Sequence, residues 1–89
     1  GGVVGAFMEQ AACFHLVAKM RNPVLPKIIN FSVDYLSPTL ADKTAIAQCQ
    51  LTRQGRHIAN INILCWQNSR EKPCATARAH FLIPENETG

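Results

Sequence analysis

The residues best suited to do chemistry lie at the N-terminal end of the chain. Gly1 and Gly2 open an apolar run in which Glu9 is the only acidic residue. Unpaired N–H groups at a helix start carry a partial positive charge of about half a unit, so the glycine amides could hold a developing oxyanion. Glu9 follows about two helical turns later. Its carboxylate could activate a water molecule as a general base or attack as a nucleophile.

The helical neighbours of Glu9 are small, which leaves room for a substrate beside the carboxylate. Three and four positions away the sequence has only glycine, alanine and cysteine, at Gly5, Ala6, Ala12 and Cys13. Cys13 follows Glu9 by one turn. Two interpretations of this thiol are open, because it either lines a binding site or is an ordinary core cysteine.

A helix over about residues 3–21 must position these groups. Apolar side chains cover almost its whole circumference, which is typical of a buried helix and predicts that the rest of the chain encloses it. The helix is expected to stop before Asn22 and Pro23, because proline disfavours a helical conformation in the residue before it.

From Lys27 onward, apolar residues alternate with polar ones, as in strands with one buried face. Turn residues divide this region into four expected strands, at about residues 27–36, 44–53, 56–67 and 73–83. Alanine recurs on one face of these strands, which would let a bulky helix lie close. The sequence therefore predicts a single α+β domain over residues 1–89, with an antiparallel sheet wrapped around one long central helix.

Composition limits the function. The formal net charge of +3 comes from scattered side chains, whereas a nucleic-acid binder of this size normally shows a dense basic stripe. Arg53 and Arg56 form the one local concentration, which suits a small anionic ligand or is simply a solvated surface. Charged and polar residues interrupt the only apolar run that approaches a membrane span, so no membrane insertion is expected.

Cysteine content and hydrophobicity indicate compartment and assembly. The four cysteines form no CxxC pair and lie in apolar segments. This pattern is typical of reduced core thiols in a cytoplasmic protein, so neither a disulfide framework nor a metal site is expected. With 47% hydrophobic and 17% charged residues, a chain of 89 residues is apolar for its size. We expect it to complete its burial in a homo-oligomer.

Four stretches together resemble the hotdog-fold acyl-CoA thioesterases, particularly the phenylacetate-pathway and 4-hydroxybenzoyl-CoA types. They are the two glycines followed by an acid in a helix, then FSVDYLSP, LTRQGRHIA and PCATARAHF, and they cover the chain to about Ile83. The resemblance implies a sheet wrapped around the helix. It also implies edge-to-edge pairing of sheets in a homodimer or homotetramer, with active sites between subunits. The family motif has a histidine before its glycines, so an N-terminal segment and a first strand are expected to be missing before Gly1.

The resemblance implies hydrolysis of an acyl-CoA thioester to a free acid and CoA. Glu9 would be the general base or nucleophile, and the helix start at Gly1 and Gly2 the oxyanion hole. The thioester is the substrate, so no cofactor is expected. Residues expected to bind the substrate are Cys13, Ser32, Leu36, Ser37, Pro38, Arg53, Gln54, Gly55, Arg56 and His57.

Physical arguments support part of this set. CoA carries several phosphate charges, and Arg53 and Arg56 flank a glycine turn that is expected to expose backbone N–H groups beside two guanidinium groups. Ser32 lies on the polar face of its strand and is expected to reach the acyl pocket of a partner subunit. An alternative function is a module that binds acyl-CoA without turning it over, as a sensor or assembly domain. A hydratase would need a histidine beside Glu9, which this helix does not offer.

Overall fold

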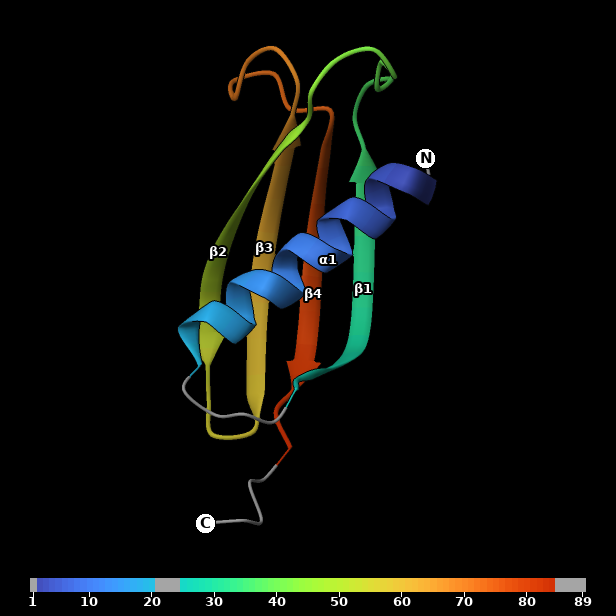
Figure 1. Cartoon of the computed structure of the whole chain (residues 1–89). Helices are drawn as coiled ribbons and strands as arrows, with labels where there is room; N and C mark the ends of the chain where they lie inside the picture. The colour runs from blue at the N-terminus through green and yellow to red at the C-terminus, as the bar shows by residue number, and fades with distance from the viewer. Residues whose placement is uncertain (1, 21–24, 85–89) are drawn as a thin grey trace.

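The computed structural model describes residues 2–20 and 25–84. One helix, α1 (Gly2–Lys19), precedes the strands β1 (Lys27–Tyr35), β2 (Ile46–Gln54), β3 (Ile58–Trp66) and β4 (Ala75–Leu82). The strands form one antiparallel sheet in the order β1-β4-β3-β2, and α1 runs diagonally across one of its faces (Figure 1). The predicted α+β arrangement is confirmed, and every strand begins and ends within two residues of its expected position.

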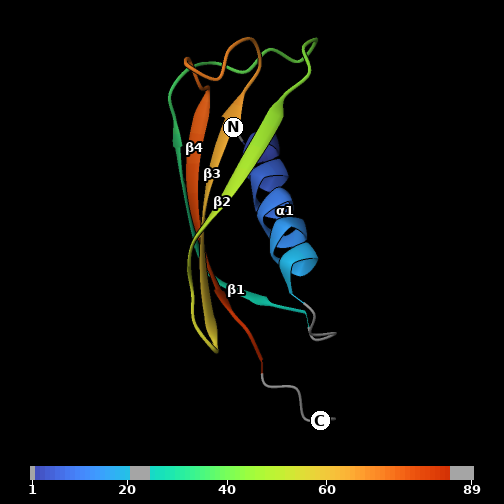
Figure 2. The ribbon, with the colours of Figure 1, turned by 90° about the vertical axis from the view of Figure 1, so that its left-hand side faces the viewer.

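The core lies between α1 and the sheet, because successive strand residues point to opposite faces. Figure 2 shows that the helix covers one face only. The row facing the helix is buried in both central strands; it consists of Ala59, Ile61, Ile63 and Cys65 in β3 and Ala75, Ala77, Ala79 and Phe81 in β4. Alanines in this row allow the close approach of α1, whose side chains Met8, Ala12 and Leu16 have no exposed surface.

The rest of the circumference of α1 is not enclosed. Val3 is 84% exposed and Phe14 72% exposed, and Glu9 also lies at the surface. Within one chain the prediction of a fully enclosed helix is therefore wrong, because the sheet contacts only the side of Met8 and Leu16. In the described ranges, no helix combines the length and apolar character of a membrane span.

A close approach fixes the first turns of α1 against the end of β1. Gly5 is buried, and a Cβ atom added there would lie 2.9 Å from the Tyr35 hydroxyl oxygen, closer than such atoms normally approach. Glycine costs a helix interior about 1 kcal/mol relative to alanine. The Tyr35 hydroxyl therefore occupies the space that a side chain at this position would enter, and the start of α1 lies beside the C-terminal end of β1.

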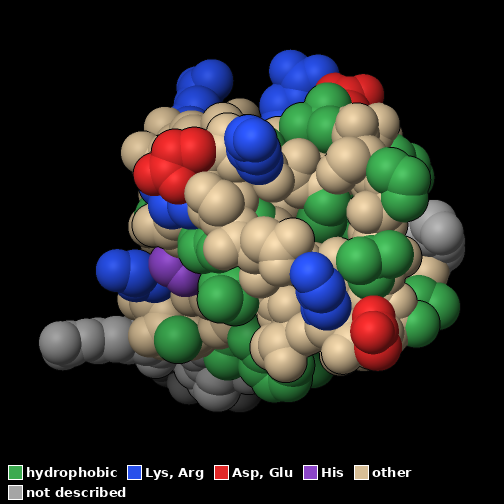
Figure 3. Space-filling view, turned by 90° about the horizontal axis from the view of Figure 1, so that it is seen from above, with side chains coloured by type: hydrophobic (Ala, Val, Ile, Leu, Met, Phe, Trp, Pro, Cys, Tyr) green, Lys and Arg blue, Asp and Glu red, His purple; other side chains and the backbone are tan. Residues whose placement is uncertain are grey.

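The side chain of Gln67 joins two long loops, the one between β1 and β2 and the one between β3 and β4. The Gln67 side-chain oxygen accepts a hydrogen bond from the Leu40 N–H at 2.9 Å, and its Nε2 donates to the carbonyls of Leu40 and Lys43 at 2.7 and 3.2 Å. The loop before β2 is thereby held against the loop before β4. Figure 3 looks onto this end and shows basic side chains interspersed with acidic ones.

Two buried thiols lie side by side where β3 ends and β4 begins. The Sγ atoms of Cys65 and Cys74 are 3.8 Å apart, and the Cys74 thiol donates to the Cys65 carbonyl at 3.4 Å. Burial, and then the interaction with Cys74, raises the pKa of the Cys65 thiol from 9.0 to about 11. This thiol therefore stays protonated in the folded chain under conditions in which an exposed thiol ionises.

We expect stability to fall in alkaline solution for this reason. Below pH 9.0 the Cys65 thiol is protonated in both states; between 9.0 and about 11 only the unfolded chain loses the proton, which favours unfolding. At about 1.4 kcal/mol per pKa unit, the free energy of unfolding should fall by on the order of 2 kcal/mol. Urea unfolding at about pH 8 and about pH 10.5 measures this. Cys65→Ala should show a smaller fall, and an equal fall in both proteins would contradict the prediction.

Candidate active site

Glu9 lines a cavity between α1 and the β1 edge of the sheet. The cavity has a volume of about 200 Å³ and is lined by Glu9, Gln10, Cys13, Pro26, Ile28 and Phe81. Glu9 and Cys13 share one side of the helix because they are four residues apart. Ile28 and Phe81 are paired across β1 and β4 and form the opposite wall. Cys13 therefore lines the same cavity as Glu9, and its contact with a substrate stays a prediction.

The cavity combines a carboxylate with mostly apolar walls. Phe81 is buried, Ile28 and Cys13 are half-buried, and the Glu9 carboxylate meets solvent. An apolar cavity of about 150 Å³ can hold a benzene molecule, so this volume suits an acyl group about the size of an aromatic ring. The arrangement can hold a small apolar group while Glu9 acts on a bond at its outer end.

The second predicted part of the site is the start of α1. Gly2 is the first residue of the helix, so its N–H is among those with no partner within the helix. Gly1 lies outside the described residues. Glu9 follows Gly2 by seven positions, which places them on the same side of α1 but about 10 Å apart along its axis. This distance joins backbone positions, and side chains on a helix lean toward its N-terminal end.

The predicted CoA contacts lie at opposite ends of the sheet. Residues 36–38 follow β1, whereas residues 53–57 cover the β2–β3 hairpin. Neighbouring strands in the order β1-β4-β3-β2 are all antiparallel, so β1 and β2 run in opposite directions. The C-terminal ends of β1 and β2 therefore lie at opposite ends of the sheet, as Figure 1 shows. One chain therefore does not bring these two segments together.

Backbone N–H groups in both segments are already used within the chain. Leu36 and Ser37 donate to the Cys74 carbonyl at 2.8 and 3.2 Å, and Gly55 donates to the Ile58 carbonyl at 2.7 Å. The Gly55 N–H is not available to a ligand, because closing the hairpin uses it. The side chains of Arg53 and Arg56 are exposed, so the guanidinium part of the prediction still stands as a prediction.

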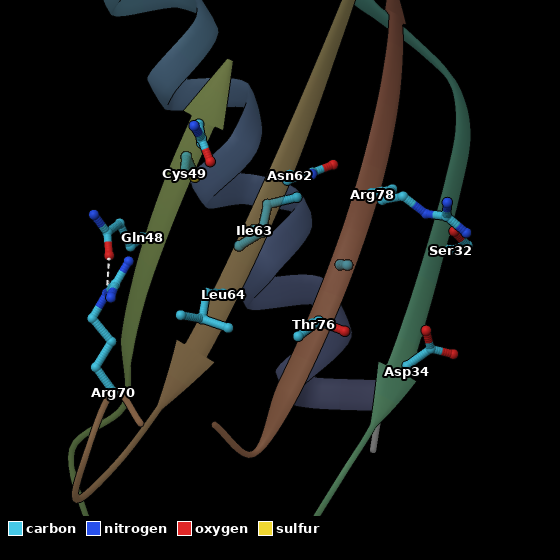
Figure 4. Close-up of a pocket in the computed structure, with 12 residues that line it drawn as sticks. Ser32, Asp34, Gln48, Cys49, Asn62, Ile63, Leu64, Arg70, Thr76 and Arg78 are labelled. Carbon is cyan, nitrogen blue, oxygen red and sulfur yellow. Dashed lines mark hydrogen bonds between the residues drawn. The ribbon is translucent and has the colours of Figure 1, made fainter. Parts of the chain in front are cut away.

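A larger hollow of about 600 Å³ lies on the sheet face away from α1. Figure 4 shows its lining, with α1 behind the sheet and with Arg70 Nε donating to Gln48 Oε1 at 2.7 Å. Ser32 lines this hollow and therefore lies on the opposite face from Glu9. Its contact with a partner's acyl pocket stays a prediction. The smaller cavity is the candidate site because the carboxylate-bearing Glu9 of α1 lines it.

Four lining residues were not predicted from the sequence, namely Gln10, Pro26, Ile28 and Phe81. The sequence did mark Phe81 as unusual, since it is the one bulky residue in an alanine-rich row of β4. No local feature of the sequence marked Ile28, because its position beside Phe81 depends on the pairing of the first and last strands. Among the described residues, no three His, Cys, Asp or Glu side chains gather as metal ligands.

Residues 1–82 match the profile of the acyl-CoA thioesterase N-terminal domain family. The chain belongs to this family. The family predicted from the four sequence stretches is confirmed, as is the hotdog arrangement of one helix on an antiparallel sheet. No curated protein matches the chain at a significant level.

Solved structures have the same fold. A protein from Chromobacterium violaceum is 47% identical with a TM-score of 0.86, and the match covers 98% of this chain and 63% of that one. A phenylacetic acid degradation-related protein from Ralstonia eutropha is 24% identical with a TM-score of 0.86, covering 93% and 61%. A hypothetical thioesterase from Streptococcus pneumoniae, solved with coenzyme A, is 13% identical with a TM-score of 0.84, covering 97% and 66%. The chain thus spans under two thirds of the length of these family relatives.

Proposed function

We propose that this domain hydrolyses an acyl-CoA thioester to a free acid and CoA. The observation that carries the proposal is the position of Glu9, which lines an apolar cavity of acyl-group size in a chain of the thioesterase family. The coenzyme A in the Streptococcus pneumoniae structure supports the choice of carrier. The four free cysteines fit the reducing cytoplasm in which we expect the reaction to occur.

The reaction needs a base, an oxyanion site and a leaving thiol. As general base, Glu9 takes a proton from water while the water oxygen bonds to the thioester carbon. The N–H groups at the start of α1 hold the resulting oxyanion. Collapse of the intermediate breaks the carbon–sulfur bond, and the CoA sulfur receives the proton from Glu9. As nucleophile, Glu9 would instead bond to the carbon, release CoA and form an anhydride that water hydrolyses.

The edge position of β1 supports a site shared between copies. The start of α1 in one copy and Glu9 of another would then supply the oxyanion donor and the base, each about 3 Å from its reacting atom. Sheet-edge pairing in a homodimer provides a route, since β1 is an edge strand of the described sheet and borders the Glu9 cavity.

One observation favours the alternative, an acyl-CoA-binding module without turnover. Glu9 is exposed in the single chain, whereas a catalytic carboxylate gains basicity when water is excluded from it.

A panel of acyl-CoAs of increasing acyl size, including an aromatic one, separates the two functions. Hydrolysis is followed by loss of thioester absorbance, because a thiol reagent would also react with half-buried Cys13 and Cys49. Calorimetry with a thioether analogue measures binding. Binding without thioester loss would establish the module and overturn the hydrolase.

The CoA half of the proposal predicts an effect of charge at the β2–β3 hairpin. Replacing Arg53 and Arg56 together by glutamine should weaken CoA binding about tenfold or more, because each guanidinium–phosphate contact is a charge-assisted hydrogen bond worth about 1.5–3 kcal/mol. The matched control replaces Arg70 and Lys72, which carry the same charge at the other end of the sheet. Titration of CoA at two salt concentrations measures the difference. Equal weakening in both variants would show a general charge effect and contradict the assignment.

A further inference from the structure

The hydroxyl of Tyr35 lies against the first turns of α1. Tyr35 is the last residue of β1 and pairs with Ala75, so it belongs to the row of the sheet that faces the helix. Its Oη atom is 2.9 Å from the position that a Cβ atom of Gly5 would take. Because Gly5 has no side chain, the hydroxyl approaches the helix backbone itself, where α1 crosses the C-terminal end of β1 (Figure 1).

Gly5 lies on the side of α1 that carries the predicted catalytic groups. Gly2 precedes it by three positions and Glu9 follows it by four, the spacing of neighbours on one side of a helix. Gly2 is about 4.5 Å away along the helix axis, and its N–H has no partner within the helix. The Tyr35 hydroxyl therefore lies beside the end of α1 at which the proposed reaction develops negative charge.

Tyr35 has the chemistry and the access that a substrate contact requires. A phenol hydroxyl donates one hydrogen bond, and here a strand residue presents it rather than the helix. Tyr35 is 49% exposed, so a ligand can reach the side chain. Residues 36–38, which are predicted to contact CoA, follow directly in the chain. A thioester whose carrier lies along that segment would have its carbonyl group near the hydroxyl.

We propose that Tyr35 is a catalytic residue of the hydrolysis and that its hydroxyl donates a hydrogen bond to the thioester oxygen, beside the N–H groups at the start of α1. The inference rests on the proposed function and adds a side-chain donor to it. The hydrogen bond strengthens as water attacks and the carbonyl oxygen gains negative charge, which lowers the barrier. Tyr35 keeps its proton throughout, since the proton taken from water passes through Glu9 to the CoA sulfur.

Deletion of this hydroxyl alone tests its role. Tyr35→Phe keeps the ring and should lower kcat about 10²–10³-fold with little change in KM, as the loss of one oxyanion donor does. Thr76→Val is the matched control, because it deletes a hydroxyl from the sheet face away from α1. An unchanged kcat for Tyr35→Phe, or an equal fall in the control, would overturn the inference.

Comparison with Glu9→Gln separates this inference from the proposed function. If Glu9→Gln is slow while Tyr35→Phe is as fast as the unchanged chain, the hydrolase stands and the role of Tyr35 fails. If the unchanged chain hydrolyses no acyl-CoA of the panel, both fail.

Fluorotyrosine tests the hydroxyl with almost no change in the shape of the side chain. Tyr35 is the only tyrosine among the 89 residues, so incorporation of fluorotyrosine changes this position alone. The fluorinated phenol is a stronger acid and therefore loses the proton that it donates at lower pH. The fall of kcat in alkaline solution should then begin at lower pH, whereas a hydroxyl that only packs against Gly5 would leave the pH profile of kcat unchanged. An unchanged profile would overturn the inference.

Discussion

Glu9→Gln is expected to slow thioester hydrolysis by about 10²–10⁴-fold while acyl-CoA binding is retained. Glutamine has nearly the same size as glutamate, so the wall that it forms with Cys13 should keep its shape. It has no basic oxygen to take a proton from water and is a poor nucleophile. The loss should therefore appear in kcat, with little change in KM.

The measurement compares kcat and KM of the variant with those of the unchanged chain, using the best substrate of the acyl-CoA panel. Asp34→Asn is the matched control, because it makes the same carboxylate-to-amide change on the sheet face away from α1. Hydrolysis at the original rate by Glu9→Gln would exclude this carboxylate as base and as nucleophile. An equal loss in Asp34→Asn would show that the effect comes from net charge rather than from position.

Local patterns were enough to predict the helix and the four strands, and to place Glu9 and Cys13 on the same side of the helix. Alternation of apolar and polar residues located the strands, and a four-residue spacing on a helix always sets two side chains on one side. The second wall of the cavity is a different case. Ile28 meets Phe81 only because the first strand pairs with the last, and no local period in either segment records that register.

The helix shows a second limit of sequence patterns. An apolar circumference indicates that α1 is covered, but it does not distinguish cover by its own sheet from cover by another chain. The structure separates the two sides, since Met8 and Leu16 pack on the sheet whereas Phe14 does not. Gly55 shows a third limit. Among the N–H groups of the glycine turn, that of Gly55 is used to close the hairpin through a hydrogen bond to the Ile58 carbonyl, a partner that the sequence pattern does not identify.

Phe81→Ala is expected to destabilise the fold by about 3–5 kcal/mol, the usual cost of removing a buried phenyl ring. Phe81 is 1% exposed and is among the largest fully buried side chains in the described core. Its ring also lines the cavity beside Glu9, so core and site share this one residue. Leu82→Ala is the matched control on the next position of β4. Leu82 is 39% exposed on the opposite face, and its loss should cost under about 1 kcal/mol.

Urea unfolding of both variants measures the difference, and a similar cost for the two would contradict the assignment of Phe81 to the face under α1. Phe81→Leu keeps most of the apolar volume and provides a folded protein if the alanine variant unfolds. Because the ring forms one wall of the Glu9 cavity, the leucine variant should enlarge the cavity as well as weaken the core. Its acyl-CoA preference should then shift toward larger acyl groups while the effect of Glu9→Gln is unchanged, since in the proposed reaction the carboxylate acts at the carbonyl end of the substrate and Phe81 contacts its acyl end.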